Sequence, residues 1–289
     1  MASALKRGLK LLRRRNVINL AGHRIEMPAS HQLPAIRAKY PHYEGEISRL
    51  AEFLGNTEGR IVMIDIGANV GDTTALILSK PHAQFLCIEA SPEFFEFLRR
   101  NVSAFANVRC LHALVTDPDD LSRDLGLVEV NGTAHVAERT ISKSGTTAPR
   151  VTLDRILSQA PEFPAPNFLK IDTDGYELKV LRGATHLLRD SRPAIHFELS
   201  FRHWKNVGGT TWKEAADLLV ANGYKECLVY DNVGYLVAVD QFADGRVLPV
   251  MESYAARRDQ FYLNVITFHC SSPHWSAFKQ NELDRPFDS

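Results

Sequence analysis

From Arg60 onward, short apolar runs alternate with amphipathic segments. Seven runs have the length and apolar content of strands in a buried sheet, namely IVMID, QFLCIEA, NVRCLHALV, FLKID, AIHFELS, KECLVYDNVGYLVAV and FYLNVITFH. Most of them are followed by a segment with helical periodicity, such as YELKVLRGATHLL or TWKEAADLLVANG. This order predicts an α/β fold, a three-layer α/β/α sandwich around a mostly parallel, seven-stranded sheet.

Two stretches depart from this alternation. Residues 1–55 have six lysines and arginines within residues 1–15, then prolines at positions 34 and 41, and a helical stripe after Tyr43. We expect this stretch to be a basic, helical N-terminal extension that covers the functional site, and residues 56–289 to be the main domain. Residues 117–150 are polar and contain several glycines, which predicts loops or a small hairpin insert.

Composition and charge narrow the class of protein. The 289 residues are 45% hydrophobic and 24% charged, and their formal net charge of zero gives no electrostatic bias toward nucleic acid. No apolar run reaches the roughly 18 residues of a membrane span. The four cysteines lie far apart without a C-x-x-C motif, which indicates free thiols in a reducing compartment. We therefore expect a cytoplasmic protein, in which residues 1–15 form a solvated basic arm or a peripheral membrane contact.

The segment VMIDIGANVGD joins a strand to a helix through a turn that contains Asp65, Gly67 and Gly71. A dinucleotide-binding turn has the spacing G-x-G-x-x-G, and this turn lacks the middle glycine, which disfavours a nicotinamide cofactor. Its spacing, D-x-G-x-x-x-G, agrees with the turn of S-adenosylmethionine-dependent methyltransferases. Glu89 lies 24 residues after Asp65, at the end of the second strand, where a carboxylate can accept hydrogen bonds from two ribose hydroxyls.

These positions predict a site for S-adenosylmethionine, whose product is S-adenosylhomocysteine. The cofactor carries a sulfonium and an amino group, so acidic strand ends suit it, whereas they would repel a pyrophosphate. Asp117 has an alternative role as a loop cap, since it directly follows the third strand. The predicted cofactor-binding residues are Asp65, Gly67, Ala68, Asn69, Gly71, Asp72, Glu89, Ala90, Asn101 and Asp117.

The chain resembles the FkbM family of methyltransferases over most of its length. The segments that carry the resemblance are PAIRAKYPHYEGEISRLAEFL, IDIGANVGD, VTLDRIL, FLKIDTDGYELKVLRGA and RPAIHFELS. The family usually has Glu where this chain has Asp174, and a small residue where it has Tyr176. The resemblance implies a class I, Rossmann-like methyltransferase fold and O-methylation of a hydroxyl on a sugar, a glycolipid or a natural product.

Methyl transfer to an alcohol requires alignment of donor and acceptor and a base for the hydroxyl proton. Asp172 and Asp174 alternate just beyond the fourth strand, so we expect both carboxylates on one side, as a base or as ligands of a divalent cation. Three of the candidates have structural alternatives: Asp174 as a helix cap, His196 as a core histidine and Lys170 as half of an ion pair. The predicted catalytic residues are Lys170, Asp172, Asp174, His196 and Glu198, and a Mg²⁺ site, if present, would use Asp172, Asp174 and Glu198.

Three other functions stay open at this point: a divalent-metal-dependent sugar O-methyltransferase, an NAD(P)-dependent oxidoreductase and a non-catalytic binding module. The predicted acceptor is a small molecule or a glycan, with His203 and Trp204 as candidate walls of its pocket. The sequence identifies neither the acceptor nor the oligomeric state.

Overall fold

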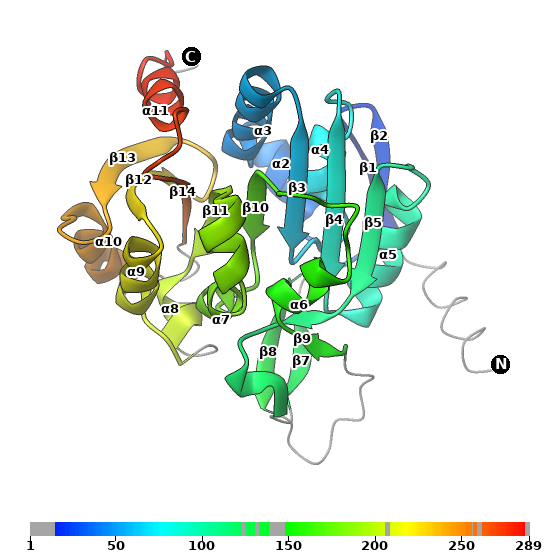
Figure 1. Cartoon of the computed structure of the whole chain (residues 1–289). Helices are drawn as coiled ribbons and strands as arrows, with labels where there is room; N and C mark the ends of the chain where they lie inside the picture. Colours follow the sequence, from blue (N-terminus) through cyan, green and yellow to red (C-terminus); the bar gives the residue numbers. More distant parts are fainter. Residues whose placement is uncertain are drawn as a thin grey trace, which may run out of the picture.

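A computed structural model describes residues 15–122, 125–130, 133–138, 148–205, 209–255, 257–258 and 262–286. One eight-stranded sheet forms its centre, with the strand order β13-β12-β14-β11-β10-β3-β4-β5 (Figure 1). The strands are β3 (Ile61–Ile66), β4 (Ala83–Glu89), β5 (Val108–His112), β10 (Phe168–Ile171), β11 (Ala194–Leu199), β12 (Tyr224–Asp231), β13 (Leu236–Gln241) and β14 (Leu263–His269).

The five strands from β11 to β5 run parallel, whereas β14 runs antiparallel between β11 and β12. The order β5-β4-β3-β10-β11-β14-β12, with β14 reversed, is that of the class I methyltransferase fold, and it confirms the predicted α/β class. The edge strand β13 is a second reversed strand, antiparallel to β12. The prediction of seven strands was wrong by one. The run KECLVYDNVGYLVAV folds into two antiparallel strands, β12 and β13, because Asp231 accepts hydrogen bonds from the backbone N–H groups of Val233 and Tyr235 and closes a turn.

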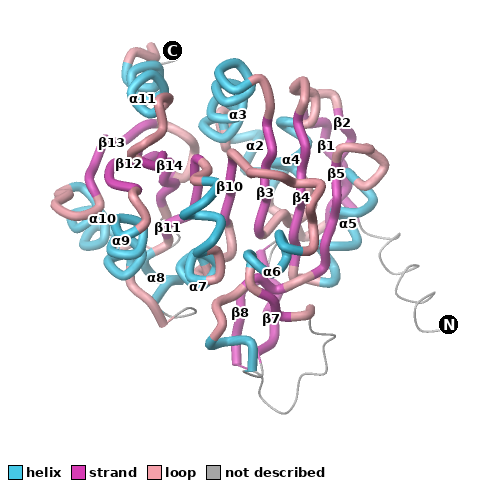
Figure 2. The backbone as a smooth tube through the Cα atoms, in the orientation of Figure 1, coloured by secondary structure: helices cyan, strands magenta, loops and turns pink. Residues whose placement is uncertain are grey.

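Helices cover both faces of the sheet and complete three layers (Figures 1 and 2). Along β3, side chains alternate between the two hydrophobic cores: Ile64 packs with α6 and α7, while Met63 packs with α3 and α5. α4 packs against α3 and β4, whereas α9 contacts β12, α10 contacts β13 and α11 contacts β14. The helices are α2 (Leu33–Lys39), α3 (Gly45–Glu58), α4 (Asp72–Ile77), α5 (Pro92–Val102), α6 (Leu153–Ser158), α7 (Glu177–Arg182), α8 (Phe201–His203), α9 (Trp212–Ala221), α10 (Val247–Ala255) and α11 (Trp275–Leu283).

The N-terminal extension is only partly helical. Before α2 and α3 it forms a β-hairpin of β1 (Arg15–Leu20) and β2 (His23–Pro28), which the prediction of a helical extension missed. The hairpin turns its apolar side, with Ile25 and Met27, onto Phe97 of α5. This packing stabilises the hairpin, because an isolated two-stranded hairpin is only marginally stable in water.

The predicted insert is confirmed as a hairpin of β7 (Leu125–Val130) and β8 (Thr133–Glu138). The short strands β6 (Leu114–Val115) and β9 (Arg150–Val151) precede and follow this hairpin in the chain and pair with each other.

Within the described ranges, no helix is long and apolar enough to cross a membrane. Residues 1–14 lie outside the described residues, so the membrane contact of residues 1–15 and the cytoplasmic location stay predictions.

Candidate functional site

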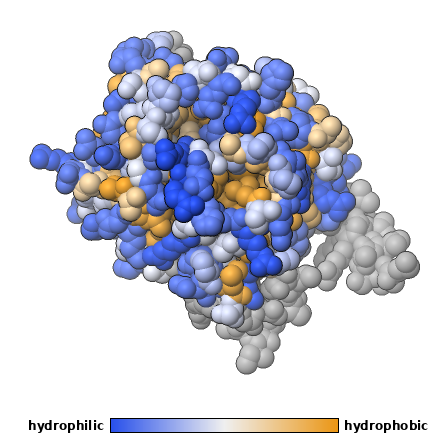
Figure 3. Space-filling view, in the orientation of Figure 1, coloured by the Kyte–Doolittle hydropathy of each residue, from blue (hydrophilic) through white to orange (hydrophobic). Residues whose placement is uncertain are grey.

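A cavity of about 1230 Å³ lies at the carboxyl ends of the central parallel strands. The turn after β3, the end of β4 and the loops after β10 and β11 all line it, together with α2 and the hairpin insert. Ligands of open α/β sheets bind at this edge, where adjacent strand ends leave a crevice. On the face shown in Figure 3, apolar residues gather in a hollowed central region and hydrophilic residues surround it.

The glycine turn after β3 approaches the end of β10 closely. Gly67 has a φ of +75°, and a Cβ at this position would lie 1.7 Å from the carbonyl oxygen of Asp172. Both the backbone conformation and the space therefore require glycine. The turn continues through Asn69, which lines the cavity, to α4.

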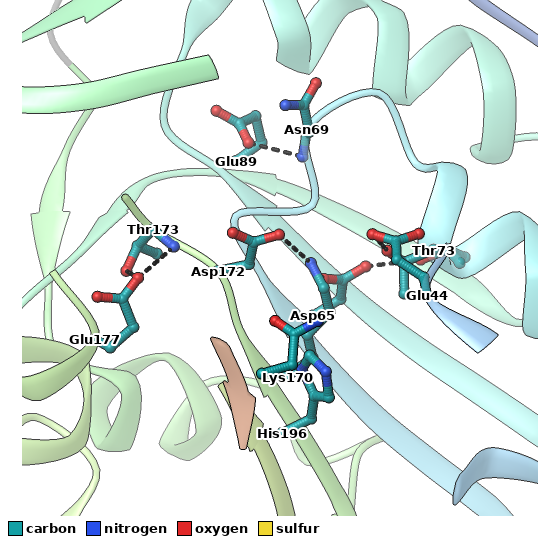
Figure 4. Close-up of polar contacts among 12 residues, drawn as sticks. Glu44, Asp65, Asn69, Thr73, Glu89, Lys170, Asp172, Thr173, Glu177 and His196 are labelled. Carbon is teal, nitrogen blue, oxygen red and sulfur yellow. Dashed lines mark hydrogen bonds and ion pairs between the residues drawn. The ribbon is translucent and has the colours of Figure 1, made fainter. Parts of the chain in front are cut away.

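Glu89 at the end of β4 is held by the backbone of this turn. Its carboxylate accepts hydrogen bonds from the N–H of Asn69 at 2.8 Å and from the N–H of Ser91 at 2.6 Å (Figure 4). Burial raises the pKa of Glu89 to about 7, although these N–H donors act in the opposite direction. The side chain lines the cavity, so its remaining acceptor capacity faces the space where a ligand would lie.

A buried polar row crosses the sheet beneath the cavity. Lys170 pairs in register with Asp65 on β3 and with His196 on β11. Its ammonium lies 3.2 Å from Asp65 and 3.3 Å from Asp172. Figure 4 shows the contact between Lys170 and Asp172. Burial lowers the pKa of Lys170, but the surrounding carboxylates, Asp65 foremost, raise it well above its ordinary value. Lys170 is therefore a permanent cation that positions Asp172. Its ion pairs with Asp65 and Asp172 agree with the alternative role predicted for Lys170 from the sequence.

Three carboxylates, Asp172, Asp174 and Glu198, line the cavity beside this cation. Burial and the neighbouring carboxylates raise the pKa values of Asp174 and Glu198 well above the ordinary range. The loop that carries Asp174 is held by Glu177, which accepts hydrogen bonds from backbone N–H groups at residues 173 and 175. Carboxyl groups whose pKa is strongly raised by burial and by neighbouring charges cluster at functional sites.

The structure groups the possible metal ligands differently from the prediction. Asp174, Glu198 and His203 each offer a ligand atom within 4.8 Å of the others, and Asp172 is not in this group. The Nδ1 of His203 lies 3.6 Å from Asp174. The carboxylate of Asp172 contacts Lys170, so the group that the structure brings together has His203 in place of Asp172. The predicted set Asp172, Asp174 and Glu198 stays a prediction.

The cavity residues that were not predicted include Tyr43, Glu44 and Tyr262. The two tyrosines share a side-chain hydrogen bond, and burial raises the pKa of both well above the usual value. Burial and the nearby Asp72 raise the pKa of Glu44 to about 8, against the opposing effect of Arg37. No local sequence signal identifies this group, because Tyr262 lies more than 200 residues after Tyr43 and Glu44.

His196 is predicted as catalytic but does not line the cavity. It lies in the interior of β11, and its Nε2 is 3.2 Å from a carboxylate oxygen of Glu46 on α3. This placement agrees with the alternative of a core histidine, and the structure does not bring His196 to the cavity. Trp204 is also buried outside the cavity lining, whereas His203 lines the cavity.

Two predicted cofactor ligands lie elsewhere. Asn101 donates hydrogen bonds to the carbonyl oxygens of Glu26 and Val70, so it ties the N-terminal hairpin to the glycine turn. Asp117 accepts a hydrogen bond from the N–H of Asp120 at 3.0 Å and caps a 3₁₀ turn, as its alternative role predicts. Neither side chain lines the cavity, so the structure does not bring Asn101 and Asp117 to the site.

The other predicted cofactor residues separate into two groups. Gly67, Asn69, Asp72, Glu89 and Ala90 line the cavity. Three lie beneath it and shape it instead: Asp65, Ala68 and Gly71.

The comparisons with known proteins agree with this geometry. The model of the methyltransferase FkbM domain matches residues 65–226, which is more than half of the chain. Hexuronic acid methyltransferase AglP of Haloferax volcanii is 26% identical over 147 residues, which cover 50% of this chain and 59% of that protein. The chain thus matches less than two thirds of this relative's length.

Two solved structures give weaker similarity. A methyltransferase FkbM from Methylobacillus flagellatus KT has a TM-score of 0.43 at 15% identity, over 73% of this chain and 44% of that one. TYW2 of M. jannaschii, solved in complex with AdoMet, has a TM-score of 0.42 at 14% identity, over 88% of this chain and 86% of that one.

Proposed function

The chain belongs to the FkbM family of S-adenosylmethionine-dependent methyltransferases, and we propose that it methylates a hydroxyl of a sugar, a glycolipid or a natural product. The observation that carries this proposal is one cavity that joins the glycine turn and Glu89 to the carboxylates after β10 and β11. A sugar acceptor is further supported by the relative named as a hexuronic acid methyltransferase.

The turn end of the cavity fits a nucleoside cofactor. Gly67 leaves bare backbone where any side chain would clash, and Glu89 offers carboxylate oxygens for ribose hydroxyls. Asn69, Asp72 and Ala90 complete the residues that would hold S-adenosylmethionine. When bound, this cofactor supplies an electrophilic methyl group on a positively charged sulfur. The acidic lining favours that positive charge.

The carboxylates at the other end would orient the acceptor and take its proton. We assign the base to Asp172, whose side chain is 36% exposed toward the cavity and is fixed by the ammonium of Lys170. One of its carboxylate oxygens would accept the hydroxyl proton as the acceptor oxygen becomes nucleophilic. Asp174 and Glu198 would then hydrogen-bond neighbouring hydroxyls, which suits their high proton affinity.

The N-terminal extension would cover the acceptor end. Tyr43 and Glu44 line the cavity just before α3, opposite a segment near the C-terminal end that contributes Tyr262. This division corresponds to an extension over residues 1–55 and a methyltransferase domain over residues 56–289. The tyrosine pair would exclude water from the reacting atoms.

A metal-dependent version of the same activity is the second candidate. Its support is the group of Asp174, Glu198 and His203, two carboxylates and one imidazole with converging ligand atoms. An imidazole in the set favours a transition-metal ion over Mg²⁺. If EDTA treatment leaves turnover unchanged, this version is wrong, while the cofactor assignment is unaffected.

The first experiment is a calorimetric titration of the purified protein with S-adenosylhomocysteine, with NADH as the comparison ligand. The proposal expects saturable binding of the nucleoside and none of NADH, and the reverse result would favour an oxidoreductase. The acceptor can be sought by mass spectrometry of cells that express the protein or its Glu89→Gln variant. Metabolites that gain one methyl group with the wild-type protein alone identify it.

A further inference from the structure

The rim of the cavity carries a charge opposite to that of its interior. Four cationic side chains line the cavity and are exposed: Arg202, Lys205, Arg257 and Arg258. We call these four residues the cationic rim. The carboxylates of the lining, from Glu44 to Glu198, are buried or half-buried instead.

We infer that the cationic rim binds an anionic group of the acceptor, a carboxylate or a phosphate. In this orientation an uncharged hydroxyl of the same acceptor faces the inner carboxylates. The inference rests on the proposed function and adds the chemical class of the acceptor to it.

The rim is assembled by the tertiary structure from two distant segments. Arg202 lies on α8 and Lys205 just after it, whereas Arg257 and Arg258 follow α10. α8 packs against α10, which brings the two segments to one side of the cavity. Convergence of four cations from separate elements on one cavity differs from an ordinary exposed charge run, which follows a single element.

Three of the rim cations, Lys205, Arg257 and Arg258, have positive charge available for a ligand. Within the described ranges, neither Lys205 nor Arg257 forms an ion pair with a carboxylate. The guanidinium of Arg258 lies over the ring of Tyr254, 4.9 Å from its centroid, which restrains its plane while leaving its N–H donors open. Guanidinium groups bind carboxylate and phosphate through paired, charge-assisted hydrogen bonds.

One acidic side chain, Glu252 on α10, also lines the rim side of the cavity. Its carboxylate accepts a hydrogen bond from the indole N–H of Trp212 at 2.8 Å, which holds it toward α9. Among the described residues of the lining, the four cations therefore outnumber the acid on this side.

Charge separation across the cavity would orient the acceptor. An anionic group placed beside Asp172 and Glu198 would meet carboxylates and be repelled, whereas at the rim it meets guanidinium groups. A molecule with an acid at one end and hydroxyls at the other has its lowest energy with the acid outward. A neutral acceptor would gain nothing from the rim.

A matched set of sugars tests this inference directly. D-glucose, D-glucuronate and D-glucose 6-phosphate are titrated calorimetrically into protein saturated with S-adenosylhomocysteine. We expect at least one anionic sugar to bind about tenfold more tightly than glucose, and this preference to shrink at high salt. The relative affinities of glucuronate and the phosphate tell which anion the rim prefers.

The double variant Arg257→Gln, Arg258→Gln should bind the anionic sugars about as weakly as glucose, with its affinity for S-adenosylhomocysteine unchanged. The matched control is Arg99→Gln, Arg189→Gln, which removes two exposed charges outside the cavity lining and should keep the preference. Equal or undetectable binding of all three sugars by the wild-type protein overturns the inference, as does a preference that survives in the rim variant. Failure to bind S-adenosylhomocysteine would instead overturn the proposed function.

Discussion

The two ends of the cavity are built in different ways. The cofactor end comes from one continuous stretch, the turn after β3 and the end of β4, within residues 65–90. The acceptor end combines Tyr43 and Glu44 with the loops after β10 and β11 and with the rim near residue 258. The first is held by backbone geometry and the second by opposed charges on separate elements.

This difference determines which changes each end tolerates. At the cofactor end, Gly67 and the N–H donors to Glu89 belong to the main chain, so an added methyl group disturbs the fold itself. At the acceptor end, isosteric loss of a charge leaves the packing intact and alters chemistry or binding. Substitutions can therefore separate the two ends.

The largest effect is expected at the acceptor end. Asp172→Asn should lower kcat by about 10²- to 10⁴-fold, because the amide cannot accept the hydroxyl proton. Binding of S-adenosylhomocysteine should not change, since Lys170 keeps its contact with Asp65. Single-turnover kinetics on the identified acceptor measures the first quantity and calorimetry the second. Unchanged turnover would remove Asp172 as the base, and the exposed Asp190→Asn serves as the control.

Gly67→Ala should break the cofactor end and destabilise the domain. A Cβ at 1.7 Å from a backbone oxygen forces β3 and β10 apart, so we expect a loss of about 3 kcal/mol in unfolding free energy. Gly22→Ala is the matched control, since Gly22 has a φ of +87° but no atom within 4 Å of an added Cβ. Its cost should be about 1 kcal/mol in urea unfolding. Equal losses in the two variants would contradict the close approach at Gly67.

Glu89→Gln tests the cofactor end without adding volume. The amide retains one acceptor oxygen, so a hydrogen bond to the turn can persist. The side chain loses its negative charge and part of its capacity to accept hydrogen bonds from ribose hydroxyls. We expect affinity for S-adenosylhomocysteine to fall by about 10- to 100-fold. The exposed Glu162→Gln should leave the affinity as it is. If Glu89→Gln binds like the wild-type protein, the nucleoside is not held at this strand end.

The last prediction concerns Glu44 and the pH dependence of stability. Its pKa is about 8 in the folded protein and near 4.5 in the unfolded chain, so between these values unfolding releases a proton. Stability should therefore fall as pH rises from about 4.5 to 8, by at most about 1.4 kcal/mol per pH unit from this group. Glu44→Gln should flatten the slope in urea unfolding at several pH values. A slope equal to that of the wild-type protein would show that Glu44 titrates normally.

The histidines show why sequence reasoning succeeds at one end and fails at the other. His196 and Glu198 share one side of a strand, so the alternation of side chains suggests that both face the site. His196 lies two residues deeper, about 6–7 Å from the strand end, where Glu46 of α3 covers it. His203 reaches the carboxylates instead, because α8 turns back over the sheet edge.

The order of strands and helices, the glycine turn and Glu89 are determined by the sequence alone, because each depends on residues within one turn or one strand-helix unit. The hairpin of residues 15–28, the partners of Asn101 and Asp117, the Tyr43–Tyr262 pair and the cationic rim were decided only by the tertiary structure. Their side chains meet across large separations in the chain. Local propensity carries no information on which distant surfaces pack together, since that depends on the burial of whole faces.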